Sequence, residues 1–241
     1  MQRTVYEKFL ELCRQKIEKL RVGEGLNSEA EMGPLIHERQ LRTVEEHVND
    51  AVARGARLIA GGRRLPDLGP NFYAPTLLAD VTHDMRIMQE ETFGPALPVA
   101  PFDTDEDALR LANDSQFGLA ASVWTTNTKR GEALAARIRA GTVMVNDAIS
   151  AFGIAEAPHG GFEQSGIGRA HGELGLAEMV LVKYVDVDLL PRMKKVWWYG
   201  YSAVFQRQMS GFVDMMFGRS LGPKIKGTIG FVGALRRKNQ V

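Results

Sequence analysis

The sequence has a single cysteine and no long hydrophobic run. Cys13 is the one cysteine among 241 residues, which excludes an internal disulfide and fits a reducing cytosol. No run of about 18 apolar residues occurs, so we expect no transmembrane helix. The first residues, MQRTVYEKFLELCRQ, are charged and lack the apolar core of a signal peptide. We therefore expect a cytoplasmic protein, and 44% hydrophobic and 24% charged residues are ordinary for a globular chain with a sizeable core.

Acidic residues are nearly absent from the C-terminal segment. Residues 191–241 hold ten Lys and Arg residues and one acid, Asp214, which is a balance of +9. Residues 1–190 hold 20 basic and 28 acidic residues, which is a balance of −8. So sharp a division predicts a separate basic tail with a partner of its own.

Two kinds of site are also missing. The five histidines are scattered and one cysteine cannot build a thiolate site, so we expect no metal ion. The glycine-rich stretch PHGGFEQSGIGR, residues 158–169, lacks the ending of a phosphate-binding loop. Its Gly166 and Gly168 are followed by Gly172, one residue too far for the dinucleotide pattern G-x-G-x-x-G. The stretch is typical of a tight loop that needs positive φ angles or close packing.

Cys13 is a poor candidate for a nucleophile. It shares an apolar helical stripe with Phe9 and Ile17. Burial among apolar side chains raises the pKa of a thiol rather than lowering it. The pattern therefore predicts a packed cysteine in the core.

Helical and extended patterns alternate along the chain. The spacing predicts helices over 4–20, 37–54, 103–115, 128–141 and 171–180, and strands over 56–62, 72–81, 96–102, 118–127, 142–147 and 181–189. The apolar stripe of the first helix is Val5, Phe9, Leu12, Cys13, Ile17 and Leu20, and that of the second is Leu41, Val44, Val48 and Val52. Thr4 and Glu7 are expected to form a capping box at the start of the first helix. This alternation predicts an α/β domain with a mainly parallel sheet and flanking helices, because parallel strands need helical crossovers.

The basic segment contains one amphipathic pattern. The stretch YSAVFQRQMSGFVDMMFG, residues 201–218, places Tyr201, Val204, Phe205, Met209, Phe212 and Met216 along one helical stripe. A basic, aromatic and amphipathic helix is typical of a membrane surface, and Trp197 and Trp198 lie nearby. Alternatively, the stripe packs on the protein's own core. The later piece GTIGFVGAL is far too short to span a bilayer.

The stretch EETFGP, residues 90–95, combines two carboxylates with an aromatic ring, a glycine and a proline. One interpretation is a turn that ends at Gly94, with Phe93 buried. The other is a cofactor site, because Glu91 and Phe93 share a side of an extended segment. There the carboxylate would accept hydrogen bonds from ribose hydroxyls while the ring packs on a flat base or nicotinamide. The residues alone leave both interpretations open.

Seven sequence blocks follow one another along the chain: MGPLI (32–36), FYAPTLLADV (72–81), EETFGP (90–95), FGLAASVWT (117–125), AGTVMVN (140–146), GGFEQSGIGR (160–169) and LVKYV (181–185). They occur in the order and spacing seen in aldehyde dehydrogenases, and the chain resembles that family over about residues 1–188. The resemblance implies oxidation of an aldehyde to an acid with NAD or NADP. In that family a cysteine thiolate attacks the aldehyde, hydride passes to nicotinamide, and a glutamate-activated water hydrolyses the thioester.

The resemblance also implies cofactor-binding residues. Glu91 and Phe93 match the family's E-x-F-G-P residues, which contact the ribose and ring of the nicotinamide. Gln40 is a weaker match to a glutamine near the cofactor in the helix after GPLI. The choice between NAD and NADP is made in a dinucleotide-binding domain that has no counterpart among these blocks.

A second set of matches implies the aldehyde tunnel. Residues 148–158, which follow Asn146, match the segment that lines it. The family usually reads Pro-Phe-Gly-Gly where this chain has Pro158 and His159 before two glycines. We therefore expect Asn146, Pro158 and His159 at the tunnel, with chemistry altered by the histidine.

By this alignment the family's G-Q-x-C nucleophile block falls before Met1, so we expect a C-terminal part that is inactive alone. We expect a catalytic domain over 1–177, an oligomerisation strand over 178–190 and the basic tail over 191–241. Expected partners are a small aldehyde and a homo-oligomer or full-length subunit, with peripheral membrane contact through the tail and no nucleic acid. The alternative is a non-catalytic module that binds cofactor or pairs with another subunit.

Overall fold

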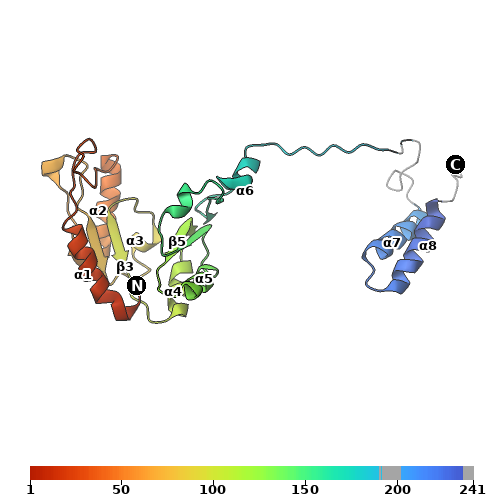
Figure 1. Cartoon of the computed structure of the whole chain (residues 1–241), viewed down its shortest axis with the longest axis horizontal. Coiled ribbons are helices and arrows are strands. Elements are labelled where there is room, and N and C mark those ends of the chain that lie inside the picture. Colours follow the sequence, from red (N-terminus) through yellow and green to blue (C-terminus); the bar gives the residue numbers. More distant parts are fainter. Residues whose placement is uncertain (190, 192–201, 236–241) are drawn as a thin grey trace. The chain divides into compact units, whose positions relative to one another are not determined.

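The computed structural model describes residues 1–189, 191 and 202–235, and its chain divides into two units, Met1–Leu181 and Val182–Val241 (Figure 1). The first unit contains η1 (Arg3–Val5), α1 (Tyr6–Ile17), α2 (Glu38–Ala53), β1 (Arg57–Ala60), η2 (Pro66–Leu68), β2 (Thr76–Ala79), α3 (Arg86–Gln89), β3 (Ala96–Val99), α4 (Asp105–Asn113), β4 (Phe117–Gly118), β5 (Ala120–Val123), α5 (Thr128–Ala135), β6 (Thr142–Val145), η3 (Ser150–Gly153), β7 (Phe162–Glu163) and α6 (Gly172–Ala177). The second contains α7 (Ala203–Phe217) and α8 (Leu221–Leu235).

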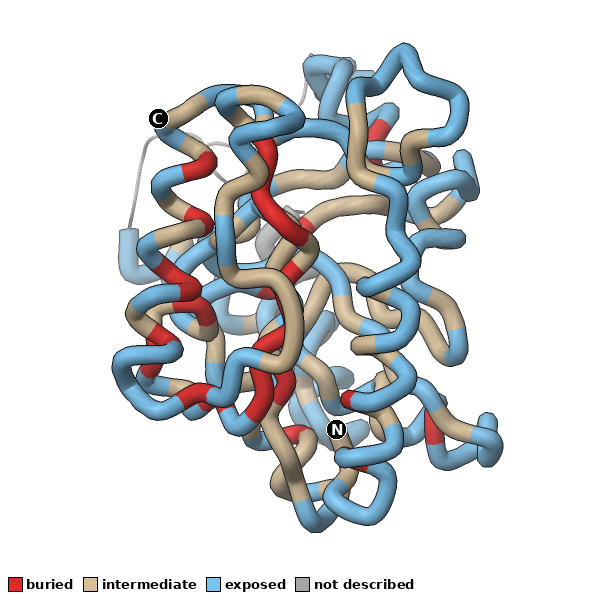
Figure 2. Tube along the Cα trace, turned by 90° about the vertical axis from the view of Figure 1, so that its left-hand side faces the viewer, coloured by how far each residue is buried: buried red, intermediate tan, exposed pale blue. Residues whose placement is uncertain are grey.

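Strand β2 is the centre of the core. All four of its residues are buried, because helices cover both faces of the sheet. Leu77 packs in a cluster with Tyr6 and Leu10 of α1, whereas Leu78 packs in a cluster with Leu41 and other residues of α2. The buried segments in Figure 2 therefore belong mainly to the first hundred or so residues, between Tyr6 and Leu109.

The sheets are small and mixed, so the expected mainly parallel sheet is wrong. The first sheet has the order β1–β2–β3, with β1 antiparallel and β3 parallel to β2. Two further pairs are β5–β6, parallel, and β4–β7, antiparallel. The link from β1 to β2 holds one short 3-10 helix, so it turns back instead of crossing over as a parallel pair would require.

Helix α1 begins later than expected and buries only part of the expected stripe. Its N-cap is Val5, which makes no side-chain cap, so the capping box is wrong. The buried residues are Tyr6 and Leu10. Of the expected stripe, Phe9, Cys13 and Ile17 pack against the same cluster, whereas Val5, Leu12 and Leu20 are exposed. Tyr6 faces inward because its hydroxyl donates to the Val99 carbonyl at 3.0 Å and accepts from the Asp80 N–H at 2.7 Å.

The other predicted elements are largely confirmed. In α2 the expected Leu41, Val44 and Val48 are buried, but Val52 is 41% exposed. Helix α4 is capped by Thr104. The helix predicted to reach residue 141 instead ends near Ala135 as α5.

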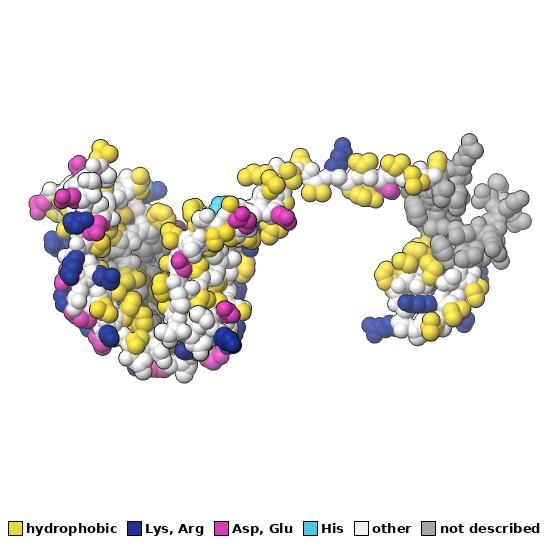
Figure 3. Space-filling model, viewed as in Figure 1, with side chains coloured by type: hydrophobic (Ala, Val, Ile, Leu, Met, Phe, Trp, Pro, Cys, Tyr) yellow, Lys and Arg dark blue, Asp and Glu magenta, His cyan; other side chains and the backbone are white. Residues whose placement is uncertain are grey.

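Residues 181–189 form no strand, contrary to expectation. They are assigned to no element, and the described part of the chain offers them no neighbouring strand to pair with. Their apolar side chains are exposed, as Figure 3 shows for the extended segment after α6. The exposed residues are Leu181, Val182, Tyr184, Val185, Val187 and Leu189.

Residues 202–235 form two helices rather than one amphipathic tail helix. Ser202 caps α7 by accepting a hydrogen bond from the Phe205 N–H at 3.2 Å. Of the expected stripe, Phe205, Met209 and Phe212 are half-buried. The rest differ: Val204 and Met216 are exposed, and Tyr201, like Trp197 and Trp198, lies outside the described residues. Within the described ranges no helix has the length and apolarity needed to cross a membrane.

The buried strand β2 gives a stability prediction. Leu77→Ala should lower the free energy of unfolding by about 2–5 kcal/mol, because it leaves a cavity between α1 and the sheet. Leu26 is fully exposed, so the matched substitution Leu26→Ala should change it by about 0.5 kcal/mol or less. Urea unfolding followed by circular dichroism measures both, and equal effects would contradict the placement of β2 in the core.

Candidate functional site

The Glu90–Pro95 loop lies between α3 and β3 and is anchored to α2. The Gln40 side-chain Nε2 donates to the backbone carbonyl of Thr92 at 2.7 Å and to that of Phe93 at 3.3 Å. His47, two turns farther along α2, bonds to the same loop. One face of a helix therefore holds the loop at two points.

His47 is a buried side chain that connects helix α2 to the loop. Its side chain is 1% exposed, with Nδ1 3.0 Å from Thr92 Oγ1 and Nε2 3.2 Å from Glu90 Oε2. An ionised carboxylate only accepts hydrogen bonds, so Nε2 carries a proton and donates to Glu90. In the neutral ring Nδ1 then accepts from the Thr92 hydroxyl, which satisfies both nitrogens. Sequence reasoning missed His47, although a polar residue beside Val48 in an apolar stripe was a signal.

The two adjacent carboxylates face different surroundings. Glu90 forms an ion pair with Arg86, with Oε1 2.9 Å from Nε. This guanidinium, and then His47, lower the pKa of Glu90 to about 2. The side chain of Glu91 is exposed, and no described residue bonds to its carboxylate. Glu90 therefore holds the loop, and Glu91 is left available to a ligand.

The middle of the loop has an unusual backbone. Phe93 has a φ of 42° and its ring is 77% exposed, so the interpretation with a buried Phe93 is wrong. A Cβ on Gly94 would overlap Val44 Cγ2 of α2, so only glycine fits the close approach there. The positive φ also breaks the extended geometry that would put Glu91 and Phe93 on one side.

Glu91 and Phe93 do not line the same hollow. Glu91 borders a hollow formed with the segments around β4 and before β6, and Phe93 is not part of its lining. The other lining residues are Ala112, Ser115, Phe117, Gly118, Leu119, Ala120, Ala121, Ile138, Arg139, Ala140, Gln164 and Ser165. Gln40 and Phe93 are brought together, but only through the Phe93 backbone.

The expected tunnel residues lie on separate turns. Asn146 follows β6 with a φ of 60°, and its Oδ1 accepts from the Thr125 N–H at 2.8 Å. Pro158 is exposed. His159 pairs with Ala170 through two backbone hydrogen bonds of 2.7 Å. The hydrogen bonds of Asn146 thus hold the turn after β6 and do not reach Pro158 or His159.

The His159 ring belongs to a three-ring cluster. It meets Phe152 edge to face at a centroid distance of 5.4 Å, and His171 lies 6.1 Å away. His171 has a φ of 66°, and its Nδ1 is buried without a hydrogen-bond partner among the described residues. Sequence spacing gave no signal for Phe152 or His171, because the loop from η3 to α6 brings the three rings together.

Cys13 is half-buried beside the second core cluster, together with Phe9 and Ile17. Burial raises the pKa of its thiol, which is the direction expected for a cysteine packed against apolar side chains. Over the described residues, no group of three or more His, Cys, Asp or Glu side chains could hold a metal ion.

The anchored carboxylate gives a pH prediction. The pKa of Glu90 falls from 4.5 to about 2 on folding, so its stabilising effect is present above pH 4.5 and is lost as the pH falls toward about 2. Urea unfolding should show Glu90→Gln less stable than the parent at neutral pH, with the difference shrinking below pH 4.5. Glu91→Gln is the matched control and should show no such difference. A Glu90→Gln difference that does not change with pH would refute the ionic anchor.

Comparisons with known proteins bear on the whole first unit. The model of the "Aldehyde dehydrogenase family" matches residues 1–185. "Putative succinate-semialdehyde dehydrogenase (NADP(+)) 2" from Mycobacterium ulcerans is 45% identical over 177 residues, which cover 73% of this chain and 34% of that protein. "Succinate-semialdehyde dehydrogenase, mitochondrial" from Oryza sativa is 40% identical over 185 residues, 77% of this chain and 34% of that protein.

Solved structures agree with these relatives. The NAD+ complex of an aldehyde dehydrogenase from Bacillus cereus has a TM-score of 0.73 at 40% identity, and the match covers 78% of this chain and 38% of that one. This chain spans about a third of the length of the curated relatives it matches. The matched family model, the identity of the relatives and the shared fold together show that the chain belongs to the aldehyde dehydrogenase family.

Proposed function

We propose that the chain is the C-terminal part of an NAD(P)-dependent aldehyde dehydrogenase that oxidises an aldehyde to a carboxylic acid. The observation that carries the proposal is the anchored Glu90–Pro95 loop, which presents Glu91 and Phe93 to solvent within a chain of this family. The names of the relatives from Mycobacterium ulcerans and Oryza sativa favour succinate semialdehyde, a short aldehyde that carries a carboxylate.

The loop fits one part of a nicotinamide cofactor. The Glu91 carboxylate is free to accept hydrogen bonds from two ribose hydroxyls. The exposed Phe93 ring offers a flat apolar surface, and Gln40 fixes the backbone beneath it. NAD or NADP, when bound, supplies the hydride acceptor. The residues of this chain bind and orient that group and leave the covalent chemistry to others.

The nucleophile and the general base are proposed to come from the rest of the dehydrogenase. Cys13 is half-buried against the core and its thiol pKa is raised, so it does not suit attack on an aldehyde. In this proposal residues 1–177 belong to the catalytic domain and 178–190 form an oligomerisation strand. Asn146, Pro158 and His159 contribute to the aldehyde tunnel, where a histidine ring replaces the family's phenylalanine.

A second candidate function is a non-catalytic module that pairs with another subunit. The exposed apolar run at 181–189 favours it, because the unpaired backbone groups of such a segment can hydrogen-bond to a strand of another chain. The two candidates differ in whether Glu91 affects turnover after the chain has joined a partner.

Reconstitution tests both. The chain alone should form no NADPH from succinate semialdehyde, whereas co-expression with the remaining N-terminal part of the Mycobacterium ulcerans relative should restore turnover. In that complex Glu91→Gln should lower kcat/KM by about tenfold or more, because a hydrogen bond to a charged group is lost. Glu29→Gln, an exposed control, should leave it unchanged.

Three results separate the candidates. Turnover by the chain alone that disappears in Cys13→Ala would overturn the proposal. A stable complex in which Glu91→Gln leaves kcat/KM unchanged would overturn the assigned cofactor site. A stable complex without turnover would favour the pairing module.

The exposed run at 181–189 also predicts self-association. The purified chain should form oligomers or aggregates at micromolar concentration, since an unpaired apolar strand is a template for pairing. The double substitution Val185→Lys with Val187→Lys should reduce the mass measured by light scattering. Leu26→Lys with Ile167→Lys, both fully exposed positions elsewhere, is the matched control. A monodisperse monomer of the parent chain would contradict the prediction.

A further inference from the structure

The outer surface of α8 is apolar although it faces solvent. Leu221, Ile225 and Ile229 follow one another at intervals of four residues, so they lie on one face of the helix. Their exposed fractions are 77%, 57% and 68%. Soluble proteins seldom leave a continuous row of large aliphatic side chains in water without a partner. We call this row the α8 stripe.

Helix α8 packs on α7 through a glycine. Gly227 is the only buried residue among 221–230, and a Cβ there would meet the Gly211 carbonyl and the Met215 N–H of α7. Ile225 and Ile229 lie two residues before and after Gly227, which places them on the opposite face of the helix. The helix therefore turns its smallest residue toward its neighbour and its larger aliphatic residues away from it.

Basic side chains border the α8 stripe. Lys224 and Lys226 flank Ile225 in the sequence and are both exposed. Asp214 is the one acid between residues 191 and 241, and it lies on α7. Any surface that covers the stripe must therefore accept apolar side chains and positive charge together, which excludes a purely hydrophobic partner and favours an anionic one.

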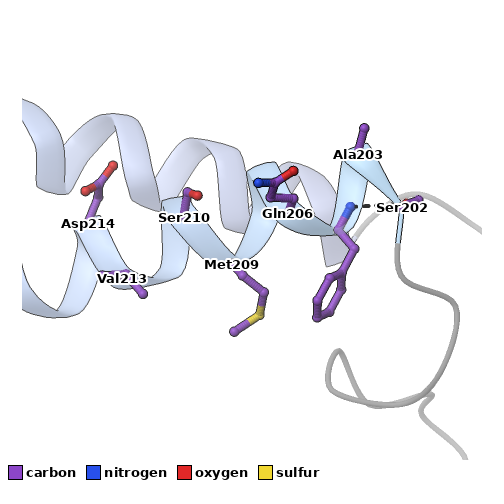
Figure 4. Close-up of a pocket in the computed structure, with 8 residues that line it drawn as sticks. Ser202, Ala203, Gln206, Met209, Ser210, Val213 and Asp214 are labelled. Atoms are coloured by element: carbon purple, nitrogen blue, oxygen red, sulfur yellow. Dashed lines mark hydrogen bonds between the residues drawn. The ribbon is translucent and has the colours of Figure 1, made fainter.

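The hollow along α7 does not have this character. It is lined by Phe205, Met209 and Val213 but also by Gln206, Ser210 and Asp214, with Ser202 and Ala203 at its end. Figure 4 shows Ser210 and Asp214 on one edge of the helix and Met209 and Val213 on the other. Polar groups and a carboxylate in the same hollow make it a poor seat for acyl chains, so the α8 stripe is the stronger candidate.

We propose that the α8 stripe docks the protein on an anionic membrane surface. Helix α8 has 15 residues and is about 22 Å long, shorter than the roughly 30 Å hydrocarbon core, so it lies in the interface with its aliphatic face toward the acyl chains. Lys224 and Lys226 then reach the phosphate groups. A second copy of the α7–α8 helix pair is a weaker partner, because two equally basic surfaces repel. The stripe also lies outside residues 1–185, which match the family model.

Vesicle flotation of the full chain tests the proposal, because bound protein rises with the vesicles while aggregates sink. The parent chain should float with phosphatidylcholine–phosphatidylglycerol vesicles, float poorly with pure phosphatidylcholine, and lose binding as salt is raised. Lys224→Gln with Lys226→Gln should weaken binding about tenfold or more. Ile225→Ser with Ile229→Ser should weaken it comparably by removing the aliphatic anchor.

Matched controls are Lys8→Gln with Lys16→Gln for charge, and Leu26→Ser with Ile167→Ser for exposed apolar area. All variants change exposed residues, and circular dichroism checks that their helix content is unchanged. Flotation that is equal in the stripe variants and the controls would overturn the proposal. The proposal would also be overturned if neither the parent chain nor any variant floated. If the stripe variants lost self-association while no protein bound vesicles, the partner of the stripe would be a second copy of the chain.

Discussion

The contact between His47 and the Glu90–Pro95 loop fixes the geometry of the candidate site. A buried imidazole with both nitrogens engaged has one orientation, so Thr92 and Glu90 are held relative to α2. Helix α2 is itself fixed by its apolar face in the core. The loop then leads into β3, and the Pro95 carbonyl accepts from the Thr76 N–H at 2.8 Å, which sets the start of the parallel pairing with β2. The loop backbone that carries the exposed side chains is therefore held in position by α2 and by the start of β3.

The two adjacent glutamates have different roles in that loop. Glu90 is ion-paired with Arg86 and hydrogen-bonded to His47, whereas no described residue bonds to the Glu91 carboxylate. The pairing of one structural and one free acid explains why an apparently redundant Glu-Glu pair precedes an aromatic residue.

Local patterns predicted the elements better than their orientation. The stripe of α2 follows from neighbouring residues, and its Leu41, Val44 and Val48 are confirmed as buried, although Val52 is exposed. The inward position of Tyr6 in α1 could not be predicted, because its hydroxyl meets Asp80 and Val99, which are distant in the sequence. The same holds for the site: the residue types of Glu91 and Phe93 indicated a ligand surface, but the positive φ of Phe93 depends on anchors in α2. Residues 181–189 alternate like a strand, yet a strand exists only where a neighbour pairs with it.

The close approach of Gly94 to α2 links two positions that are far apart in the sequence. Val44 Cγ2 occupies the volume that any side chain at position 94 would need. Over evolutionary time the two sites are therefore not free to drift separately. A larger residue at 94 becomes tolerable only after Val44 has been replaced by a smaller one, and that exchange would open a gap in the core around α2. Substitution at either site is thus constrained by helix packing as well as by any ligand that the loop holds.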